Sequence, residues 1–416
     1  MESNAKHAVI VGGGASGIFA AIHLASIRPD ISVHLYEKSN QLLSKVKVSG
    51  GGRCNVTHHC FEPRELVKFY PRGQKELIGP FHRFNPADTV AWFADHSVKL
   101  KTEADGRMFP VTDSSQTIMN ALIDAALDAG VVIQKHCALS ALVQVNGKWQ
   151  FEINGKDKFL TEAIMIATGS SEKVWELLQK TGLKIVPPVP SLFTFHIRDK
   201  VLQDLSGVSV ANVTCRVFQS KLKSSGPLLF THWGLSGPAI LRLSAWGARE
   251  FFDKEYKFKL LISFLTEYHK EDVFEELKAI RTASQRKQVG TYSPYEQIPK
   301  RLWLYLLKRT NITIEKNWAD LNNKDLNRLS SELTEGEYEV NGKSTFKEEF
   351  VTCGGIALEE INFKTYEAIR YPGLFFGGEA LDVDALTGGF NFQHAWTSGW
   401  LAAEGMSSSI QPSPKK

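Results

Sequence analysis

The residues whose types and spacing point most directly to chemistry are three glycines near the N-terminus, spaced as Gly12-x-Gly14-x-x-Gly17. Gly12 permits a tight turn, Gly14 lets a pyrophosphate approach the backbone because it has no Cβ, and Gly17 lets a helix pack close to a strand. Twenty residues after Gly17 stands Glu37, whose carboxylate can accept hydrogen bonds from the hydroxyls of an adenosine ribose. This combination predicts a dinucleotide-binding site.

The stretches around these glycines have the composition needed to position them. Residues 8–11 form a short apolar strand, residues 18–27 an apolar helix, and residues 32–36 a second strand that ends at Glu37. The helix would present free N–H groups and the positive end of its dipole to the phosphates. A purely structural glycine turn is the alternative, and the acid at the expected distance disfavours it. The predicted contacts in this region are Gly12, Gly13, Gly14, Ala15, Ser16, Gly17, Glu37 and Lys38.

Further glycine-rich loops predict a cofactor longer than a nicotinamide dinucleotide, namely FAD. Residues 49–55 read Ser-Gly-Gly-Gly-Arg-Cys-Asn, and consecutive glycines let the backbone lie against a flat ring or a phosphate. Arg53 could hold the pyrophosphate with a bidentate fork, and Asn55 offers a donor and an acceptor to a flavin edge. The Ala-Thr-Gly run at residues 167–169 ends a buried strand and could close over the adenosine side.

The last such loops lie near the C-terminus. Glu379 follows a buried strand, where its carboxylate can bind the ribityl hydroxyls, and residues 386–393 open a helix expected to run from about 392 to 406. The N-terminus of that helix would stabilise negative charge on a reduced flavin. An ordinary strand-to-helix turn remains the alternative for each loop taken alone. The other predicted cofactor contacts are Lys45, Ser49, Gly50, Gly51, Gly52, Arg53, Asn55, Ala138, Ala167, Thr168, Gly169, Gly378, Glu379, Gly388, Gly389, Asn391, Phe392 and Gln393.

At this point the chain resembles the bacterial FAD-dependent oxidoreductases often labelled flavoprotein, a family that includes aminoacetone oxidase and a bile-acid dehydro-intermediate reductase. The resemblance covers roughly residues 6–406 and rests on motifs at residues 12–17, 49–55, 231–241, 352–356 and 378–393. It implies an α/β fold, with a Rossmann-like FAD-binding domain split in sequence, an inserted β-barrel-like domain and a small helical subdomain. It implies no single substrate, because the family's activities differ. Phe390 stands where many members have Tyr, which removes a hydroxyl.

The domain boundaries follow from changes in composition. The Val-Pro-Pro-Val-Pro run at residues 186–190 is typical of a stiff linker. We expect the FAD-binding domain over residues 1–190 and 351–410, the β-rich insert over 191–264 and 333–350, and the helical subdomain over 265–332.

Three side chains are candidates for further chemistry. His232, in the motif at 231–241, is the candidate proton donor or substrate anchor, and a packed histidine in a structural turn is the alternative. Cys54 could be redox active, but a buried inert thiol in a tight loop is favoured. The adjacent pair His58 and His59 favours a loop over a metal site, and no metal is predicted. No histidine or cysteine lies in a known flavin-linking context, so we expect non-covalent FAD.

Composition excludes several classes of function. The net charge is +4 with Lys and Arg dispersed among Asp and Glu, so nucleic-acid binding is expected to be unlikely. No apolar run is long enough for a membrane span, no signal peptide is evident, and the five scattered cysteines fit a reduced, cytoplasmic protein.

The sequence thus predicts an FAD-dependent oxidoreductase that acts on a small molecule by hydride transfer, with O2 or NAD(P)H as redox partner. The absence of a second Gly-x-Gly-x-x-Gly motif disfavours a dedicated NAD(P)H domain. A flavoprotein acting on tRNA and a non-catalytic flavin sensor are the alternatives. Nothing in the sequence indicates the oligomeric state.

Overall fold

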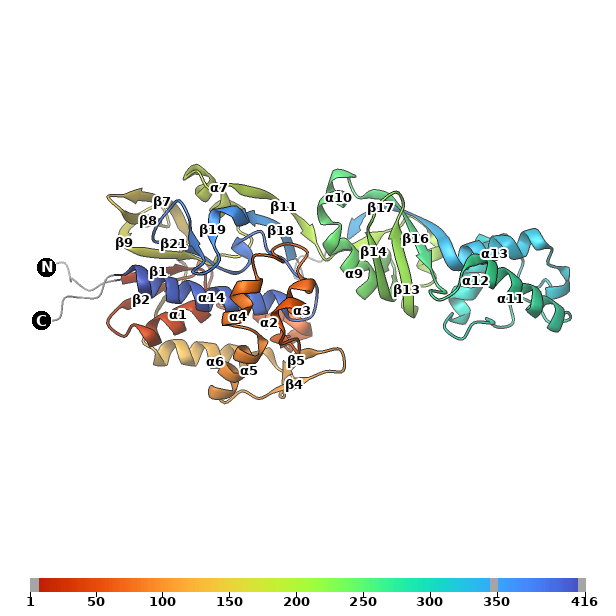
Figure 1. The fold of residues 1–416 in the computed structure, drawn as a ribbon, viewed down its shortest axis with the longest axis horizontal. Helices are drawn as coiled ribbons and strands as arrows, with labels where there is room; N and C mark the ends of the chain where they lie inside the picture. The colour runs from red at the N-terminus through yellow and green to blue at the C-terminus, as the bar shows by residue number, and fades with distance from the viewer. Residues whose placement is uncertain (1–6, 345–350, 411–416) are drawn as a thin grey trace, which may run out of the picture. The chain divides into compact units, whose positions relative to one another are not determined.

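A computed structural model describes residues 7–344 and 351–410 of the chain (Figure 1). The chain divides into two compact units, one formed by residues 1–189 with 351–416 and the other by residues 190–350. The colours in Figure 1 show that red and yellow elements of the N-terminal part share the first unit with blue elements near the C-terminus. The first unit is therefore split in the sequence, and we call it the cofactor unit; the second, inserted one is the insert unit.

A seven-stranded sheet forms the centre of the cofactor unit. The pairings of β1 with β2 and β10, of β2 with β6, and of β10 with β21 are all parallel, whereas β19 and β20 pair antiparallel at one edge. The central strands read as nearly continuous apolar runs because both faces of a parallel sheet are covered. In sheet order the strands are β19 (Ile361–Asn362), β20 (Glu367–Ala368), β21 (Leu374–Phe376), β10 (Ala163–Ile166), β1 (His7–Val11), β2 (Ser32–Tyr36) and β6 (Val132–Gln134).

Helices from the two ends of the sequence pack together in this unit. α1 (Ala15–Ile27) follows the glycine fingerprint, and α14 (Phe390–Ser409) lies beside it. A Cβ on Gly399 of α14 would stand 2.6 Å from the backbone oxygen of Ser16. The two backbones therefore approach each other closely, and this contact joins the two halves of the split unit.

Smaller elements surround the main sheet. The hairpin between β7 and β8 turns at Asn146 and Gly147, which both have positive φ, as is typical of an Asn-Gly turn. The surrounding elements are α2 (Ser44–Gly52), β3 (Thr57–His58), α3 (Pro63–Leu66), α4 (Ile78–Arg83), α5 (Pro86–Asp95), β4 (Leu100–Thr102), β5 (Arg107–Pro110), α6 (Ser115–Asp128), β7 (Leu139–Val145), β8 (Lys148–Ile153), β9 (Asp157–Thr161) and α7 (Glu172–Lys180).

The proline-rich segment at residues 186–190, expected to be a stiff linker, lies within a strand and contains the boundary between the two units at residues 189 and 190. β11 (Ile185–Ser191) pairs with β18 (Val351–Ile356) in a two-stranded sheet. Each strand of such a pair has an open edge, where a residue without an N–H costs no ladder hydrogen bond. Gly354 of β18 has a φ of +128°, and a Cβ there would stand 2.7 Å from Cα of Pro188. The glycine thus allows the two strands to approach closely.

The insert unit contains a closed antiparallel barrel. Cys215, Val217, Leu260 and Ile262 lie on its strands and are buried in its core. In order around the barrel the strands are β12 (Thr194–His196), β15 (Gly234–Ser236), β14 (Lys223–Thr231), β13 (Ser209–Val217), β16 (Lys257–Ser263) and β17 (Gly336–Ser344). The helices of this unit are α8 (Lys200–Gln203), α9 (Pro238–Trp246), α10 (Ala248–Asp253), α11 (Lys270–Ala283), α12 (Lys300–Arg309) and α13 (Asn323–Glu335).

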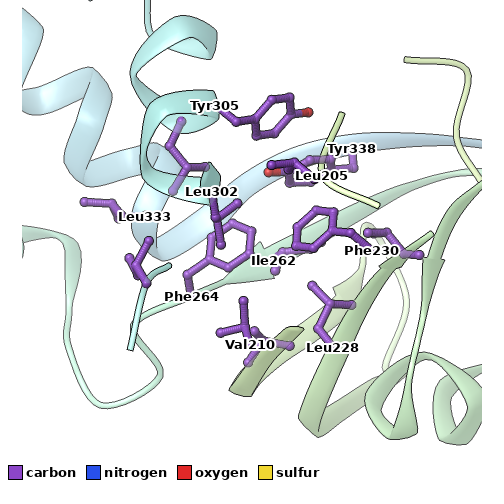
Figure 2. Close-up of a cluster of buried hydrophobic side chains, with 14 of the residues drawn as sticks. Leu205, Val210, Leu228, Phe230, Ile262, Phe264, Leu302, Tyr305, Leu333 and Tyr338 are labelled. Atoms are coloured by element: carbon purple, nitrogen blue, oxygen red, sulfur yellow. The ribbon is translucent and has the colours of Figure 1, made fainter. Parts of the chain in front are cut away.

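The barrel and the helices that follow it share one hydrophobic core (Figure 2). Phe230 and Ile262 come from barrel strands, Leu302 from α12 and Leu333 from α13, and all four are fully buried in the same cluster. Contact between these side chains removes apolar surface of both parts from water. The helical region is therefore built onto the barrel rather than around a separate core.

The predicted fold class is confirmed: a Rossmann-like domain is split in sequence by an insert that has a closed barrel and a helical region. Residues 345–350, between the end of β17 and the start of β18, lie outside the described part. Among the described helices, none has both the length and the apolar character required to cross a bilayer.

Candidate functional site

The glycine fingerprint lies between the end of β1 and the start of α1. Gly12 has a φ of +114°, and a Cβ on it would stand 2.3 Å from the backbone oxygen of Ala167. A Cβ on Gly17 would stand 2.0 Å from the backbone oxygen of Gly12, whereas one on Gly14 would meet no atom within 4 Å. Gly12 and Gly17 are thus required by packing, and Gly14 faces open space. This is the division of roles that a phosphate-binding turn needs.

Glu37 stands directly after β2, beside the fingerprint. Its carboxylate accepts hydrogen bonds from the backbone N–H of Gly13 at 2.8 Å and of Ser39 at 2.8 Å. These bonds fix the carboxylate at the edge of the turn and leave lone pairs for ribose hydroxyls. Lys38, beside it, is exposed.

The second glycine loop forms the end of α2. Gly50, Gly51 and Gly52 have φ values of +57°, +68° and +86°, so three consecutive residues adopt the left-handed conformation that glycine tolerates best. Cβ atoms on Gly51 and Gly52 would meet no atom within 4 Å. Ser49 begins this departure from helical geometry, and its hydroxyl donates to the backbone oxygen of Val46 at 2.9 Å. The loop therefore offers a bare stretch of backbone to a ligand.

Arg53, which was predicted to bind the pyrophosphate, is already engaged by neighbouring residues. Its guanidinium donates to the Glu103 carboxylate at 2.6 Å and lies 4.0 Å from the centre of the Phe109 ring. Glu103 raises the Arg53 pKa above its usual value through this hydrogen bond. Arg53 would have to exchange Glu103 for a phosphate in order to take the predicted role, so that role stays a prediction.

Asn55 joins the second glycine loop to the last one. The Asn55 amide can be oriented so that both its nitrogen and its oxygen have hydrogen-bond partners. In that orientation the nitrogen donates to the Thr57 backbone oxygen at 3.0 Å, and the oxygen accepts from the Gly389 N–H at 2.9 Å. A Cβ on Gly389 would stand 2.5 Å from the Thr57 backbone oxygen. Two loops that are more than 300 residues apart therefore meet here, and the amide predicted to face a flavin holds them together.

The loops after β10 and β21 also meet. Lys45 forms an ion pair with Glu379, and a Cβ on Gly169 would lie 3.9 Å from the same Glu379 carboxylate. The Thr168 hydroxyl is buried and has no hydrogen-bond partner among the described residues. A buried hydroxyl of this kind costs free energy unless a partner satisfies it. Together with the bare glycines, it fits a polar cofactor whose hydroxyls and phosphates would complete these contacts.

α14 begins directly after Gly388 and Gly389, as predicted. Gly389 is the N-cap of the helix in a left-handed conformation, and as a glycine it supplies no side-chain cap to the first N–H groups of the helix. Its initial N–H groups and dipole are therefore available to an anion or to a ring that becomes negatively charged on reduction. The flanking Gly378 donates its N–H to the Ser398 hydroxyl of α14 at 2.9 Å, which ties the loop after β21 to the same helix.

The polar side chains in the first turn of α14 serve the fold. The Asn391 amide exchanges hydrogen bonds with the backbone of Ala385, at 2.9 and 3.1 Å. The Gln393 side chain is fully buried, and its amide oxygen accepts from Thr57 at 2.6 Å and from Thr89 at 2.9 Å. Any contact of these two residues with a cofactor would therefore come from the backbone.

Two aromatic residues complete this turn. The Phe390 ring stacks on the Phe69 ring with centroids 4.2 Å apart and on the His58 ring at 4.6 Å. Phe392 stacks on Trp396 at 5.8 Å. Phe390 has no hydroxyl, and its ring is held by stacking on apolar and aromatic neighbours. The stacking on Phe390 also accounts for the position of the His58 ring. The described residues contain no group of three His, Cys, Asp or Glu side chains able to hold a metal.

Sequence reasoning missed a buried ion pair beneath this loop. Arg72 pairs with Asp384, whose side chain is fully buried, while that of Arg72 is 17% exposed. Burial by itself would lower the Arg72 pKa, but the charge of Asp384 outweighs it and the pKa is raised. The two residues are 312 positions apart, so no local spacing connects them. The pair fixes the segment that leads from Glu379 to Gly388.

The remaining predicted residues lie as follows. Ala138 is exposed, and its N–H donates to Asn154 at 2.9 Å. Cys54 is fully buried, and burial raises its pKa to about 12, so its thiol is neutral and unreactive at ordinary pH. His232 belongs to the insert unit, where it is exposed at the turn between β14 and β15 beside Trp233, which is 55% exposed. Its catalytic role stays a prediction.

Comparison with known proteins agrees with this geometry. A family model described as HI0933-like protein Rossmann domain matches residues 6–405. A ribosomal RNA dihydrouridine synthase from Escherichia coli is 29% identical over 409 residues, which is 95% of this chain and 97% of that protein. A 3-dehydro-bile acid delta(4,6)-reductase from Clostridium scindens is 24% identical and covers 94% and 97% of the two chains.

Solved structures show the same architecture. A 3-ketosteroid-delta4-(5alpha)-dehydrogenase from Rhodococcus jostii superposes with a TM-score of 0.51 at 12% identity, covering 99% of this chain and 98% of that one, which supports the fold alone. The family match and the arrangement of the glycine loops confirm the predicted resemblance and cofactor class. The chain belongs to the HI0933-like family of FAD-dependent oxidoreductases, and it is a flavoenzyme.

Proposed function

We propose that this flavoenzyme reduces a carbon–carbon double bond conjugated to a carbonyl group. The observation that carries the proposal is the nearly full-length similarity to two relatives whose names share this chemistry. Dihydrouridine is uridine with its C5=C6 bond, which is conjugated to a ring carbonyl, reduced. A 3-dehydro-delta(4,6) bile acid carries double bonds conjugated to a 3-oxo group.

The balanced reaction adds a hydride to the carbon remote from the carbonyl and a proton to the carbon beside it. Bound FAD, once reduced, would supply the hydride, which carries the electron pair. The first turn of α14 offers uncapped N–H groups and a positive dipole end, which stabilise negative charge on a reduced ring. The bare backbone of Gly51 and Gly52 and the carboxylates of Glu37 and Glu379 would hold the rest of the cofactor.

The chain must also supply the proton. His232 is the residue we assign to that step or to anchoring the carbonyl, because it is exposed at a strand end with an exposed Trp233 beside it. An imidazole has ring nitrogens that can donate or accept a proton, which suits a general acid. We assign the electrons to NAD(P)H as a transient reductant that binds without a domain of its own, and direct reaction with O2 is the alternative.

Two substrate classes fit this reaction. The first is a small conjugated ketone or related molecule, as predicted from the sequence. The second is a uracil base within ribosomal RNA, which is favoured by the 29% identity to the E. coli synthase over 95% of this chain. The expectation that nucleic acid is an unlikely partner therefore lacks support, and RNA remains a candidate substrate.

The test uses purified protein with its FAD under anaerobic conditions. NADH and NADPH are compared for the rate at which they bleach the flavin absorbance, and a 3-oxo-4-ene steroid, free uridine and ribosomal RNA are then added separately. We expect reoxidation of the flavin by one of these acceptors, with a product heavier by two hydrogen atoms in mass spectrometry. Reoxidation by O2 alone, with no conjugated acceptor reduced, would make the enzyme an oxidase and overturn the proposal. Failure of both nicotinamides to bleach the flavin would favour a sensor.

A further inference from the structure

Charge is distributed unevenly between the two units. Residues 190–350 contain 24 Lys and Arg against 20 Asp and Glu, so this unit has a net charge of +4, whereas the rest of the chain contains 25 of each. Within the insert unit, residues 281–328 contain ten Lys and Arg against four Asp and Glu. Residues 281–328 therefore form a locally basic stretch, although the acidic residues of α11 before it offset much of this charge over the helical region as a whole.

Backbone pairing brings part of this charge together. The Val289 N–H donates to the Lys316 oxygen at 2.9 Å, and the Trp318 N–H donates to the Lys287 oxygen at 3.0 Å. The Arg281 guanidinium donates to the backbone oxygen of Leu321 at 3.0 Å. The C-terminal end of α11 and the segment after it are thus fixed against the segment that leads into α13.

Buried aromatic residues of the helical region hold the segments that carry this charge in place. Trp303 and Trp318 are both buried, with ring centroids 6.4 Å apart, and the Trp303 indole donates to the Val289 backbone oxygen at 2.8 Å. A rigid base lowers the entropy cost of ordering the side chains above it when a ligand binds.

Some of the cations in this region are neutralised and others are not. Lys316 and Arg328 both pair with Asp325. By contrast, Arg286, Lys287 and Lys324 are exposed and form no ion pair with any residue that the structure describes. Tyr292 is 43% exposed, and the Lys287 ammonium lies 5.7 Å from its ring centre. The Arg281 guanidinium, in the last turn of α11, also donates to the Asn323 amide oxygen at 3.0 Å, which brings the neighbouring Lys324 to the same end of α11. We call the set Arg286, Lys287, Tyr292 and Lys324 the basic edge.

We propose that the basic edge binds the phosphate backbone of RNA, and this inference rests on RNA as a substrate under the proposed function. Lys and Arg neutralise phosphates, and amides such as that of Asn323, which lies beside Lys324, add hydrogen bonds to them. An exposed tyrosine offers a face on which an unpaired base can stack. The edge would hold an RNA segment while one of its bases is reduced at the flavin.

The experiment measures RNA binding by the intact holoenzyme. Fluorescence anisotropy follows a labelled single-stranded RNA of mixed sequence, and then a ribosomal RNA hairpin, over a range of salt concentrations. The test variant is R286E/K287E. The matched control is K221E/K223E, which makes the same change of charge at two exposed lysines near the turn between β13 and β14 of the same unit.

We expect the test variant to lose at least tenfold in RNA affinity and the control to change less than threefold. The slope of log affinity against log salt should become shallower by about 1.4 in the test variant, because two single-strand phosphate contacts are removed. Equal losses in both variants would show a general effect of charge and overturn the inference. So would a wild-type protein that binds RNA no better than it binds anionic phospholipid vesicles.

A second readout separates this inference from the proposed function. The test variant should keep its visible flavin spectrum, its bleaching rate with NAD(P)H and its thermal midpoint, because the changed side chains are exposed and form no ion pair with the described residues. If RNA binds at the basic edge but no conjugated acceptor is reduced, the proposed reaction fails and the binding surface stands. If a conjugated ketone is reduced but RNA does not bind, the basic edge fails and the reaction stands.

Discussion

The cofactor unit and the insert unit are held together in different ways. In the cofactor unit, loops from distant parts of the chain are tied by single polar contacts, such as Asn55 with Gly389 and Arg72 with Asp384. In the insert unit, a continuous apolar cluster joins the barrel to its helices. The first arrangement depends on a few individual side chains, whereas the second is spread over many apolar side chains. Cofactor binding should therefore be sensitive to single substitutions in the first unit and insensitive to them in the second.

The largest expected effect is that of Gly17→Val in the cofactor unit. The new Cβ would stand 2.0 Å from the Gly12 backbone oxygen, so α1 must move away from β1 and the phosphate-binding turn is lost. We expect protein without FAD, as judged by the ratio of flavin to protein absorbance. Gly14→Ala separates packing from cofactor contact: its Cβ meets no protein atom, so the protein should fold with normal stability, while the new Cβ opposes the pyrophosphate and lowers the FAD content. A Gly17→Val protein that retains full FAD would contradict the assigned packing role.

Next in size are the effects at two ion pairs of low exposure, Arg72–Asp384 in the cofactor unit and Arg309–Glu332 in the insert unit. Arg72→Met leaves Asp384 charged and buried, and the loss of one partner of such a pair costs about 3–5 kcal/mol. We expect a lower urea midpoint together with loss of FAD, and partial recovery in Arg72→Met/Asp384→Leu. Arg309→Met breaks the Arg309–Glu332 pair of the insert unit, so it should lower stability and leave the FAD content of the folded protein unchanged. If both variants lose FAD equally, the contrast between the units is wrong.

His232→Ala tests whether the insert unit contributes a residue to catalysis. A general acid contributes about a hundredfold or more, so turnover should fall by that amount while FAD content and the visible spectrum stay near wild type. Trp233→Ala, at the neighbouring exposed residue, should raise KM more than it lowers kcat if it only contacts substrate. Unchanged turnover in His232→Ala would return this residue to a structural role.

Glu37→Ala should weaken FAD binding without abolishing it. Loss of a charged acceptor costs roughly 1.5–3 kcal/mol, which is about a tenfold to a hundredfold change in affinity. Glu37 also accepts from Gly13 and Ser39, so a small loss of stability should accompany the change. FAD retention after dialysis is the measurement, and Glu37→Gln should recover part of it. Retention equal to wild type would remove Glu37 from the ribose site.

The smallest effect is expected at two of the three buried cysteines, Cys54 in the cofactor unit and Cys215 in the barrel. Burial raises the pKa of each to about 12, so roughly one thiol in ten thousand is ionised at pH 8. Iodoacetamide at pH 8 should therefore label the half-buried Cys60 and Cys137 first. The unfolded thiols ionise near pH 9 and the folded ones do not, so stability should fall as pH rises from about 9 toward 12. Rapid labelling of Cys54 alone would show local opening of the glycine loop.

The amino-acid sequence by itself determined the cofactor class and the fold class. The roles of Gly12 and Gly17 depend on neighbours in one turn and one helix, and local spacing reveals them. The hairpin at Asn146–Gly147 and the glycine start of α14 are likewise local, because turn chemistry depends on a few adjacent residues.

Only the tertiary structure decided which polar residues face a ligand and which serve the fold. Asn391 and Gln393 stand in a cofactor motif, yet their amides are used within the protein, and Arg53 is paired with Glu103. The proline run at 186–190 became a strand because β18 returns beside it from a point more than 150 residues later. A sequence pattern shows which groups a residue can offer, but its partner is chosen by chain segments that meet only after folding, where burial makes an unpaired polar group costly.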